Sequence, residues 1–354
     1  MEYVCTDRGT SKCPCALMAA GQCYTCGMLS RGKCDCRAGW QGVCPYNEYV
    51  QNGGKAQPVP AGRALKIRKV EDFSDRLKVL TLEAPLGLAL ACSRMGSFVL
   101  AGEGELSLPL SVMEAVLAGT DAELAGAEAE SGACIRLCLD VTGPKSQALD
   151  RSAESGGRLW IRGPFSSGLI NAEKYDPHRL SLVIGRGMAI MPLLNQKNLL
   201  GSGLLAMYLD ENKLTADFLA RYAAPLAYRQ VKLDESAAGT AAAGSACGSG
   251  GGDSGVCGND GGDSGVCGTD ELVALVRGDI EYCLQQTGLA PNIFFMLSPY
   301  YCLLLAERFD LDLAQVIYPN HANMCCGLGL CGACSHTDAD GVTVRACKCS
   351  EIPQ

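Results

Sequence analysis

Four cysteines near the end of the chain have the order and spacing of a metal site. Cys326, Cys331 and Cys334 follow the pattern C-x4-C-x2-C, and Cys347 comes after a short excursion. This order is typical of a plant-type [2Fe-2S] cluster, which carries one electron at a time. Four thiolates also suit a zinc ion, so a zinc knuckle is the alternative. Cys325 and Cys349 are spare thiols, and Cys349 competes with Cys347 for the role of fourth ligand.

A second group of cysteines fills the first 50 residues. The pattern C-x7-C-x-C-x7-C occurs twice in succession. A glycine-rich segment this short cannot bury a useful apolar core, so bound metal would supply its folding energy. Each half fits one [4Fe-4S] cluster or one zinc ion, and the sequence leaves the two open. The eight candidate ligands are Cys5, Cys13, Cys15, Cys23, Cys26, Cys34, Cys36 and Cys44.

Composition excludes several classes of protein. The net charge is −8 and there is no basic run, which argues against a nucleic-acid surface. No apolar stretch reaches the roughly 18 residues of a membrane span. The N-terminus, Met1-Glu2-Tyr3, lacks the features of a signal peptide, so the 22 cysteines are expected to be reduced and the protein cytoplasmic.

Short β runs separated by glycine and proline follow a polar linker at 51–62. The stretches 65–70 and 77–82 alternate with period two, and 96–100 and 158–161 are further strands. Several strands at this spacing predict a small antiparallel barrel over 63–176.

The motif Cys-Gly-Leu-Gly-Leu-Cys-Gly-Ala-Cys at 326–334 carries a family resemblance. It resembles the electron-transfer subunit of the dihydroorotate dehydrogenase B type. It is also similar to the small subunit of NADH-dependent ferredoxin:NADP oxidoreductases. Both are relatives of ferredoxin reductase, in which a flavin barrel, a nicotinamide domain and a [2Fe-2S] domain follow one another. The resemblance therefore implies bound FAD.

Three segments of the predicted barrel match flavin-binding motifs of that family in order. In the first, Leu108 stands where the family has an arginine. The second is the 141–149 loop, whose amides and serine hydroxyl could form an anion nest. The third segment, 163–168, matches the family's G-P-x-x-x-G motif. The resemblance assigns to the flavin Pro109, Leu110, Ser111, Val112, Lys145, Ser146, Gly163, Pro164 and Gly168.

An apolar run at 180–184 leads into a glycine turn, after which a helix can begin. A buried strand, a glycine turn and a helix N-terminus form a phosphate cradle, here with Gly185, Gly187 and Pro192. Ala189 replaces the second glycine of the family's loop. Asp210 and Glu211 would favour a ribose hydroxyl, although a solvated strand end explains them equally well. Another family glycine is lost in the 298–301 stretch, so NAD(P)H binding is left open.

The fold class predicted is multi-domain: an antiparallel β-barrel flavin domain and an α/β Rossmann-like nucleotide domain, with small Fe-S domains at both ends. The α/β domain spans 177–319 and the C-terminal cluster domain 320–354. A Gly-rich insertion at 236–268 holds two near copies of one ten-residue unit and is expected to be a surface loop.

Three functions compete. The first is an electron-transfer subunit that links NAD(P)H and FAD, through the [2Fe-2S] cluster, to a catalytic oxidoreductase subunit docked near the C-terminal cysteines. The second is a redox scaffold with a degenerate nucleotide site, and the third is a structural zinc protein. No Ser/His/Asp set or paired catalytic carboxylates point to other chemistry.

Overall fold

The computed structural model describes the barrel, the α/β unit and parts of the C-terminal segment. The described residues are 62–102, 107–117, 133–154, 157–233, 269–322, 324, 334–337 and 343–346. The N-terminal cysteine module, the Gly-rich insertion and the ligand candidates Cys326, Cys331 and Cys347 lie outside them.

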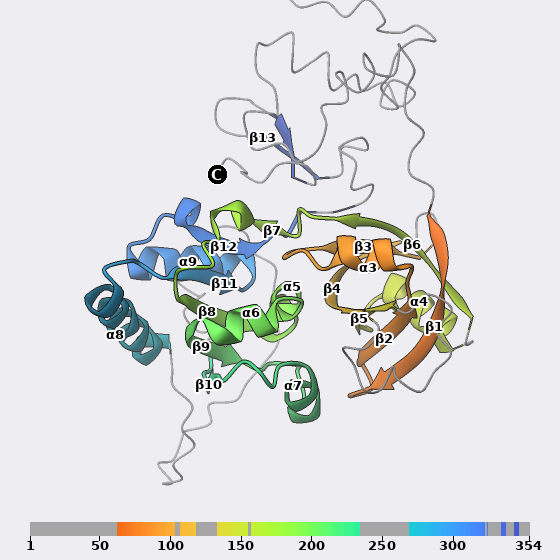
Figure 1. The fold of residues 1–354 in the computed structure, drawn as a ribbon, viewed down its shortest axis with the longest axis horizontal. Helices are drawn as coiled ribbons and strands as arrows, with labels where there is room; N and C mark the ends of the chain where they lie inside the picture. Colours follow the sequence, from red (N-terminus) through yellow and green to blue (C-terminus); the bar gives the residue numbers. More distant parts are fainter. Residues whose placement is uncertain are drawn as a thin grey trace, which may run out of the picture.

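The first unit is a closed barrel of six antiparallel strands in the order β1-β2-β5-β4-β3-β6 (Figure 1). Its strands are β1 (Arg63–Asp72), β2 (Leu77–Glu83), β3 (Phe98–Ala101), β4 (Leu108–Leu117), β5 (Ala133–Asp140) and β6 (Arg158–Phe165). The first and last strands pair to close it, with Leu65 opposite Leu159. The predicted barrel is therefore confirmed.

Every second side chain along the strands points into the barrel, and many of these side chains are branched and apolar. Leu80, Leu82, Ile135 and Leu137 are fully buried in its core. Burial of apolar surface is the main stabilising contribution here. Two helices accompany the strands, α3 (Leu86–Cys92) before β3 and α4 (Pro144–Glu154) between β5 and β6.

The second unit is a six-stranded mixed sheet in the order β10-β9-β8-β11-β12-β7. Its strands are β7 (Leu169–Ile170), β8 (Ser181–Arg186), β9 (Leu204–Asp210), β10 (Arg229–Gln230), β11 (Asn292–Met296) and β12 (Val316–Pro319). All neighbours are parallel except β7, which runs antiparallel to β12. The predicted α/β unit is confirmed at this level.

Helices cover both faces of the sheet (Figure 1). They are η4 (Ala172–Lys174), η5 (Gly187–Ile190), α5 (Met191–Leu194), α6 (Lys197–Ser202), α7 (Ala216–Tyr222), α8 (Thr269–Thr287), α9 (Pro299–Phe309) and η7 (Leu313–Gln315). One apolar cluster lies under α8 and α9. The other joins the sheet to the barrel, with Leu77 and Val79 of β2 in the same cluster as Val183 of β8 and Phe218 of α7. Phe73 adds an edge-to-face contact with Phe218, 5.4 Å between ring centroids.

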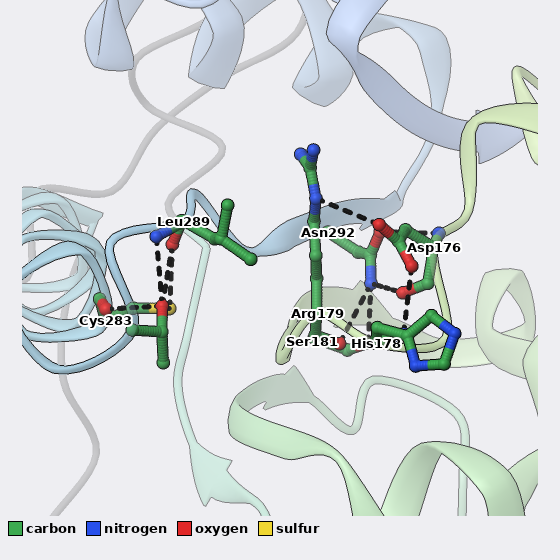
Figure 2. A network of polar contacts seen from close by, with 8 residues as sticks. Asp176, His178, Arg179, Ser181, Cys283, Leu289 and Asn292 are labelled. Atoms are coloured by element: carbon green, nitrogen blue, oxygen red, sulfur yellow. Dashed lines mark hydrogen bonds and ion pairs between the residues drawn. The ribbon is translucent and has the colours of Figure 1, made fainter.

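The Asn292 side chain makes hydrogen bonds at the amino ends of the two central strands, β8 and β11 (Figure 2). Its Nδ2 donates to the carbonyls of Asp176 (2.8 Å) and Arg179 (3.2 Å), and its Oδ1 accepts from the Asp176 amide (3.0 Å). The Asp176 carboxylate accepts from the His178 amide and pairs with Arg179. This network orders the turn into β8. It lies at the amino edge of the sheet, opposite the carboxyl edge.

The C-terminal segment contains a short hairpin of β13 (Ser335–Thr337) and β14 (Thr343–Arg345). Residues 320–334 separate it from β12 along the chain. Among the described residues, no helix is both long and apolar enough to span a bilayer.

Candidate functional site

A cavity of about 420 Å³ lies between the barrel and the loop after β8. This volume is within the range of small-molecule sites. The cavity brings together five of the residues that the sequence assigned to a cofactor. Its lining is Leu108, Pro109, Leu110, Ser111, Cys138, Leu139, Asp140, Thr142, Gly143, Pro144, Lys145, Ser146, Met188 and Met191.

The cavity exists because β4 and β5 separate at one end. Their ladder ends at the pair Val112 and Leu137. Beyond it, residues 108–111 pair only with β3, and 138–140 pair only with β2. The facing edges of these two segments have no ladder partner among the described residues. Backbone donors and acceptors are therefore available to a flat polar ligand in the gap.

Pro109 suits this part of the strand. It lies opposite Leu100 of β3, on the stretch of β4 that does not pair with β5. Proline has no N–H and is tolerated where a strand edge is unpaired. Val112, which the sequence also assigned to the cofactor, is fully buried in the barrel core and does not line the cavity.

The first turn of α4 forms the other side of the cavity. Ser146 Oγ accepts hydrogen bonds from the amides of Thr142 (2.9 Å) and Gly143 (3.0 Å) and donates to the Gly143 carbonyl. The hydroxyl thus stabilises the turn, which differs from the predicted contact between this hydroxyl and an anion. The amides of Lys145 and Ser146 are first-turn groups that have no acceptor within the helix. They can bind an anion, and the exposed Lys145 ammonium adds positive charge.

Two further cations lie at the rim. Asp140, the last residue of β5, pairs with Arg76 at 3.5 Å and with Lys213 at 3.3 Å. Lys213 belongs to the α/β unit, so this pair joins the two units beside the cavity. Such exposed pairs are worth little individually but leave a positive field at the rim.

Sulfur-containing side chains form the wall toward the α/β unit. The Cys138 Sγ lies 4.0 Å from the Met188 Sδ, and both residues line the cavity with Met191. Burial raises the pKa of the Cys138 thiol, helped by the nearby Asp140 carboxylate. The thiol is therefore neutral, and this wall is apolar and polarisable.

The other assigned glycines and prolines lie outside the cavity. Gly163 and Pro164 are in β6. Gly168 packs so closely on Gly96 that a Cβ would lie 2.3 Å from the Gly96 carbonyl oxygen. Gly185 and Gly187 flank the end of β8, and Pro192 is buried in α5. The predicted helix after the glycine turn is reduced to the 3-10 helix η5 and the four residues of α5.

The carboxyl edge of the sheet is closed by a polar network. Arg186, at the end of β8, pairs with Asp210, at the end of β9, through Nε and Oδ2 at 2.9 Å. Glu211 accepts a hydrogen bond from the Tyr228 hydroxyl at 2.7 Å. Burial, together with this carboxylate, raises the pKa of Tyr228 to about 12. Both acidic groups predicted to bind a ribose therefore have partners within the chain.

The C-terminal cysteine segment is tied to both units through Asn320. The Asn320 Nδ2 donates to the carbonyls of Ser167 (2.9 Å) and Ala346 (2.7 Å), and the Ala346 amide donates to the Cys334 carbonyl (3.1 Å). Cys334 is buried at 4% exposure in a small apolar cluster with Ala346, Ala322 and Met324. One predicted cluster ligand is thus anchored close to the connection between barrel and sheet.

The His321 ring is bonded to the backbone of the α/β unit. Its Nε2 donates to the Leu297 carbonyl at 2.7 Å. Burial lowers the pKa of His321, against the opposing effect of that hydrogen bond, so the ring is neutral. Among the described residues, no group of three or more histidine, cysteine or acidic side chains could hold a metal ion.

Sequence reasoning missed the cavity residues that come from neighbouring elements. Cys138 and Asp140 lie near the end of a strand whose sequence is an ordinary apolar run. Met188 and Met191 lie in and just after the glycine turn, and nothing in the sequence distinguishes them. Only packing brings them to the flavin segment. Their position directly before the 141–149 loop was the one signal available for Cys138 and Asp140.

No known protein-family profile and no curated protein sequence match the chain. Solved structures give weak matches. A structure of NADH-dependent reduced ferredoxin-NADP oxidoreductase, described in terms of flavin-based electron bifurcation, aligns with 82% of this chain and 88% of its own, at 16% identity and a TM-score of 0.49. A ferredoxin NADP+ reductase from Neisseria gonorrhoeae, with bound FAD and NADP, covers 70% and 91% at 16% identity and a TM-score of 0.40. The CS-b5R domains of human Ncb5or, in the NAD+ form, cover 72% and 68% at 12% identity and a TM-score of 0.45. These values are too low to carry a function to this chain.

Proposed function

We propose that the chain is a flavin-binding electron-transfer subunit, with FAD in the cavity between β4 and β5. The observation that carries this proposal is the separation of these strands at Val112 and Leu137. It opens a slot with backbone hydrogen-bonding groups on two edges and an apolar wall on a third side. A flat ring with polar edges, such as an isoalloxazine, has the matching chemistry.

The residues present fit the rest of the cofactor. The first turn of α4 would hold the pyrophosphate through the amides of Lys145 and Ser146, with the Lys145 ammonium beside it. Cys138, Met188 and Met191 would exclude water from one face of the ring. When bound, a flavin supplies the exchange between two-electron and one-electron chemistry, and the protein supplies position and tuning.

Cys326, Cys331, Cys334 and Cys347 would hold a [2Fe-2S] cluster that supplies one-electron chemistry beside the barrel. The burial of Cys334 and the bonds of Asn320 to Ser167 and Ala346 support this part of the proposal. The N-terminal cysteines would hold one or two further sites, with iron and sulfide or with zinc. A catalytic oxidoreductase subunit would dock near the C-terminal cysteines.

The test is the composition of the full chain purified without oxygen. One flavin per chain with iron and sulfide supports the proposal. A colourless protein that contains only zinc contradicts it and favours the structural zinc protein.

A matched pair of variants tests the ligand set. Cys331→Ser should abolish the EPR signal of the reduced [2Fe-2S] cluster, because it removes a thiolate ligand. Cys325→Ser should leave that signal intact. Equal signals from the two variants would show that the ligands are wrongly assigned.

A further inference from the structure

The carboxyl edge of the sheet is the place where an α/β unit of this topology would bind a nucleotide. β8 and β11 are neighbours, and the strand order continues in opposite directions from them, to β9 and β10 on one side and to β12 on the other. In open α/β sheets, ligands bind outside the carboxyl ends of the strands at such a point. The side chains there are Arg186 at the end of β8, Asp210 at the end of β9 and Tyr301 in the first turn of α9, after β11.

Both carboxylate oxygens of Asp210 are engaged by the chain. The Oδ2 pairs with the Arg186 Nε at 2.9 Å and accepts from the Leu233 amide at 3.3 Å. The Oδ1 accepts from the Asn212 amide at 3.2 Å. Asp210 is only 8% exposed. A ribose diol would have to displace the ion pair with Arg186 to reach it.

Tyr301 covers Arg186 from the α9 side. The guanidinium carbon lies 5.0 Å from the centroid of the Tyr301 ring, within the range of a cation–π contact. Tyr301 is 4% exposed, and its hydroxyl donates to the Leu233 carbonyl at 3.5 Å. One connected network thus joins the ends of β8 and β9, the chain after β10 and the start of α9.

The glycine turn is covered as well. Gly187 has a φ of +50°, and a Cβ added to it would lie 3.3 Å from the Asn212 side chain. The turn closes as the 3-10 helix η5, and α5 has only four residues, all of them buried. A pyrophosphate cradle needs an open glycine face and the N-terminus of a full helix. This turn offers neither.

From these contacts we infer that the α/β unit does not bind a nicotinamide dinucleotide, because Arg186 and its partners fill the nucleotide position. Arg186 lies between Gly185 and Gly187 of the glycine turn, and its side chain takes the place that a bound nucleotide would need. The inference concerns the sheet alone. Its consequence rests on the proposed function: the bound flavin then exchanges electrons with a protein partner, and NAD(P)H is not its direct donor.

The test is a calorimetric titration of the full-length, flavin-loaded chain with NADH and with NADPH. No saturable heat is expected up to millimolar concentrations, and neither nucleotide should raise the melting temperature. A dissociation constant on the order of 100 μM or below for either nucleotide would overturn the inference.

A double variant, Arg186→Ser with Asp210→Asn, tests whether Arg186 is the blocking group. It removes both charges, so neither is left buried without a partner. The variant should bind NADH at least about tenfold more tightly than the natural chain. Equal behaviour of the two proteins overturns the assignment to Arg186. If the variant does not fold, the titration of the natural chain still decides.

Flavin content, read from the absorbance of the same sample, separates this inference from the proposed function. A preparation that takes up no flavin contradicts the proposed function, whereas the nucleotide titration bears on the sheet by itself. A preparation with flavin that also binds NADH contradicts only the inference about Arg186.

Discussion

Lys145 is the cavity residue whose charge is most open to solvent. It follows the proline that begins α4, so its amide and its ammonium both belong to the anion site proposed for the cofactor's phosphates. The neighbouring Asp140 is already paired with Arg76 and Lys213. This leaves Lys145 as the cation that a phosphate would meet at the helix terminus.

Replacement of Lys145 by glutamine should weaken FAD binding by about three- to tenfold, since an exposed charge contributes roughly 0.6–1.4 kcal/mol here. The loss should shrink as salt is added, because exposed charges are screened. Riboflavin, which lacks phosphate, should bind equally well to both proteins. Fluorescence titration measures all of these affinities.

The control is Lys232→Gln, a change of an exposed lysine away from the cavity lining. It should leave both affinities unchanged. An equal loss for FAD and riboflavin in the Lys145 variant would show that the lysine does not contact the phosphates.

At the residue scale, five residues that the sequence assigned to the flavin line the same cavity, and their binding of a flavin stays a prediction. Pro109, Leu110 and Ser111 lie on β4, and Lys145 and Ser146 lie in the first turn of α4, so each group could be recognised as one local segment. The role of the Ser146 hydroxyl differed, since a short side chain at a helix start bonds its own backbone first. Met188 and Met191 could not be predicted as lining, because only packing between units places them there.

Asn195, just after α5, holds the α/β unit against the barrel. Its Oδ1 accepts from the Ala115 amide of β4 at 3.2 Å, and its Nδ2 donates to the carbonyls of Cys92 (2.7 Å) and Arg94 (3.2 Å). One side chain therefore joins an α/β element to both β4 and the end of α3. Hydrogen bonds as well as apolar contacts therefore hold the two units together here.

Asn195→Ala should lower the free energy of unfolding by about 2–3 kcal/mol, because it leaves partly buried backbone groups without partners. Urea denaturation measures the change. The matched control, Asn198→Ala, alters an exposed residue and should stay within about 0.5 kcal/mol. Similar losses in the two variants would contradict the role assigned to Asn195.

At the scale of elements, period-two alternation predicted β1 and β2, short runs split by glycine and proline predicted β3 and β6, and the apolar run at 180–184 predicted β8. These signals are all local. The reduction of the helix after β8 to η5 and α5 was not predictable, because tertiary packing determines it. The closure of the sheet by Arg186 and Tyr301 depends in the same way on residues more than a hundred positions apart.

A network of charged side chains joins the barrel to the helices of the α/β unit. Glu114 of β4 pairs with Lys197 of α6 at 2.8 Å and with Arg136 of β5. The Arg136 guanidinium also lies over the ring of Tyr222 in α7, 5.9 Å from its centroid. Burial acts to raise the pKa of Glu114, but Lys197 and Arg136 outweigh it, and the pKa lies below its ordinary value of 4.5.

This lowered pKa predicts a dependence of stability on pH. A carboxyl with a depressed folded-state pKa contributes stability above its unfolded pKa and loses it as the pH falls through the folded value. The free energy of unfolding should therefore decrease below about pH 4.5, and Glu114→Gln should flatten this decrease. Urea denaturation at a series of pH values measures it.

The control for this prediction is Glu281→Gln, in an exposed position of α8. It should preserve the pH dependence of the natural chain. An unchanged slope in the Glu114 variant would show that the network does not couple the two units to proton binding.

The order of units along the chain was predictable from composition and motifs, and the barrel and the sheet follow it. Their mutual position was not, because it depends on an apolar cluster assembled from both, with Leu77 and Met113 of the barrel against residues of β8 and α7. The predicted cluster modules lie largely outside the described residues and stay predictions. Only Cys334, buried beside Ala346, bears on them directly.

The most direct measurement of the central claim is a titration of the full chain with FAD, followed by flavin fluorescence. Saturation at one FAD per chain, with a dissociation constant on the order of micromolar or below, is the predicted result. Ser111→Trp should abolish binding by filling the gap between β4 and β5, whereas Leu199→Trp, at a residue that is 45% exposed, should not. Absence of saturation in the natural chain, or equal binding by the Ser111→Trp variant, would contradict a flavin in this cavity.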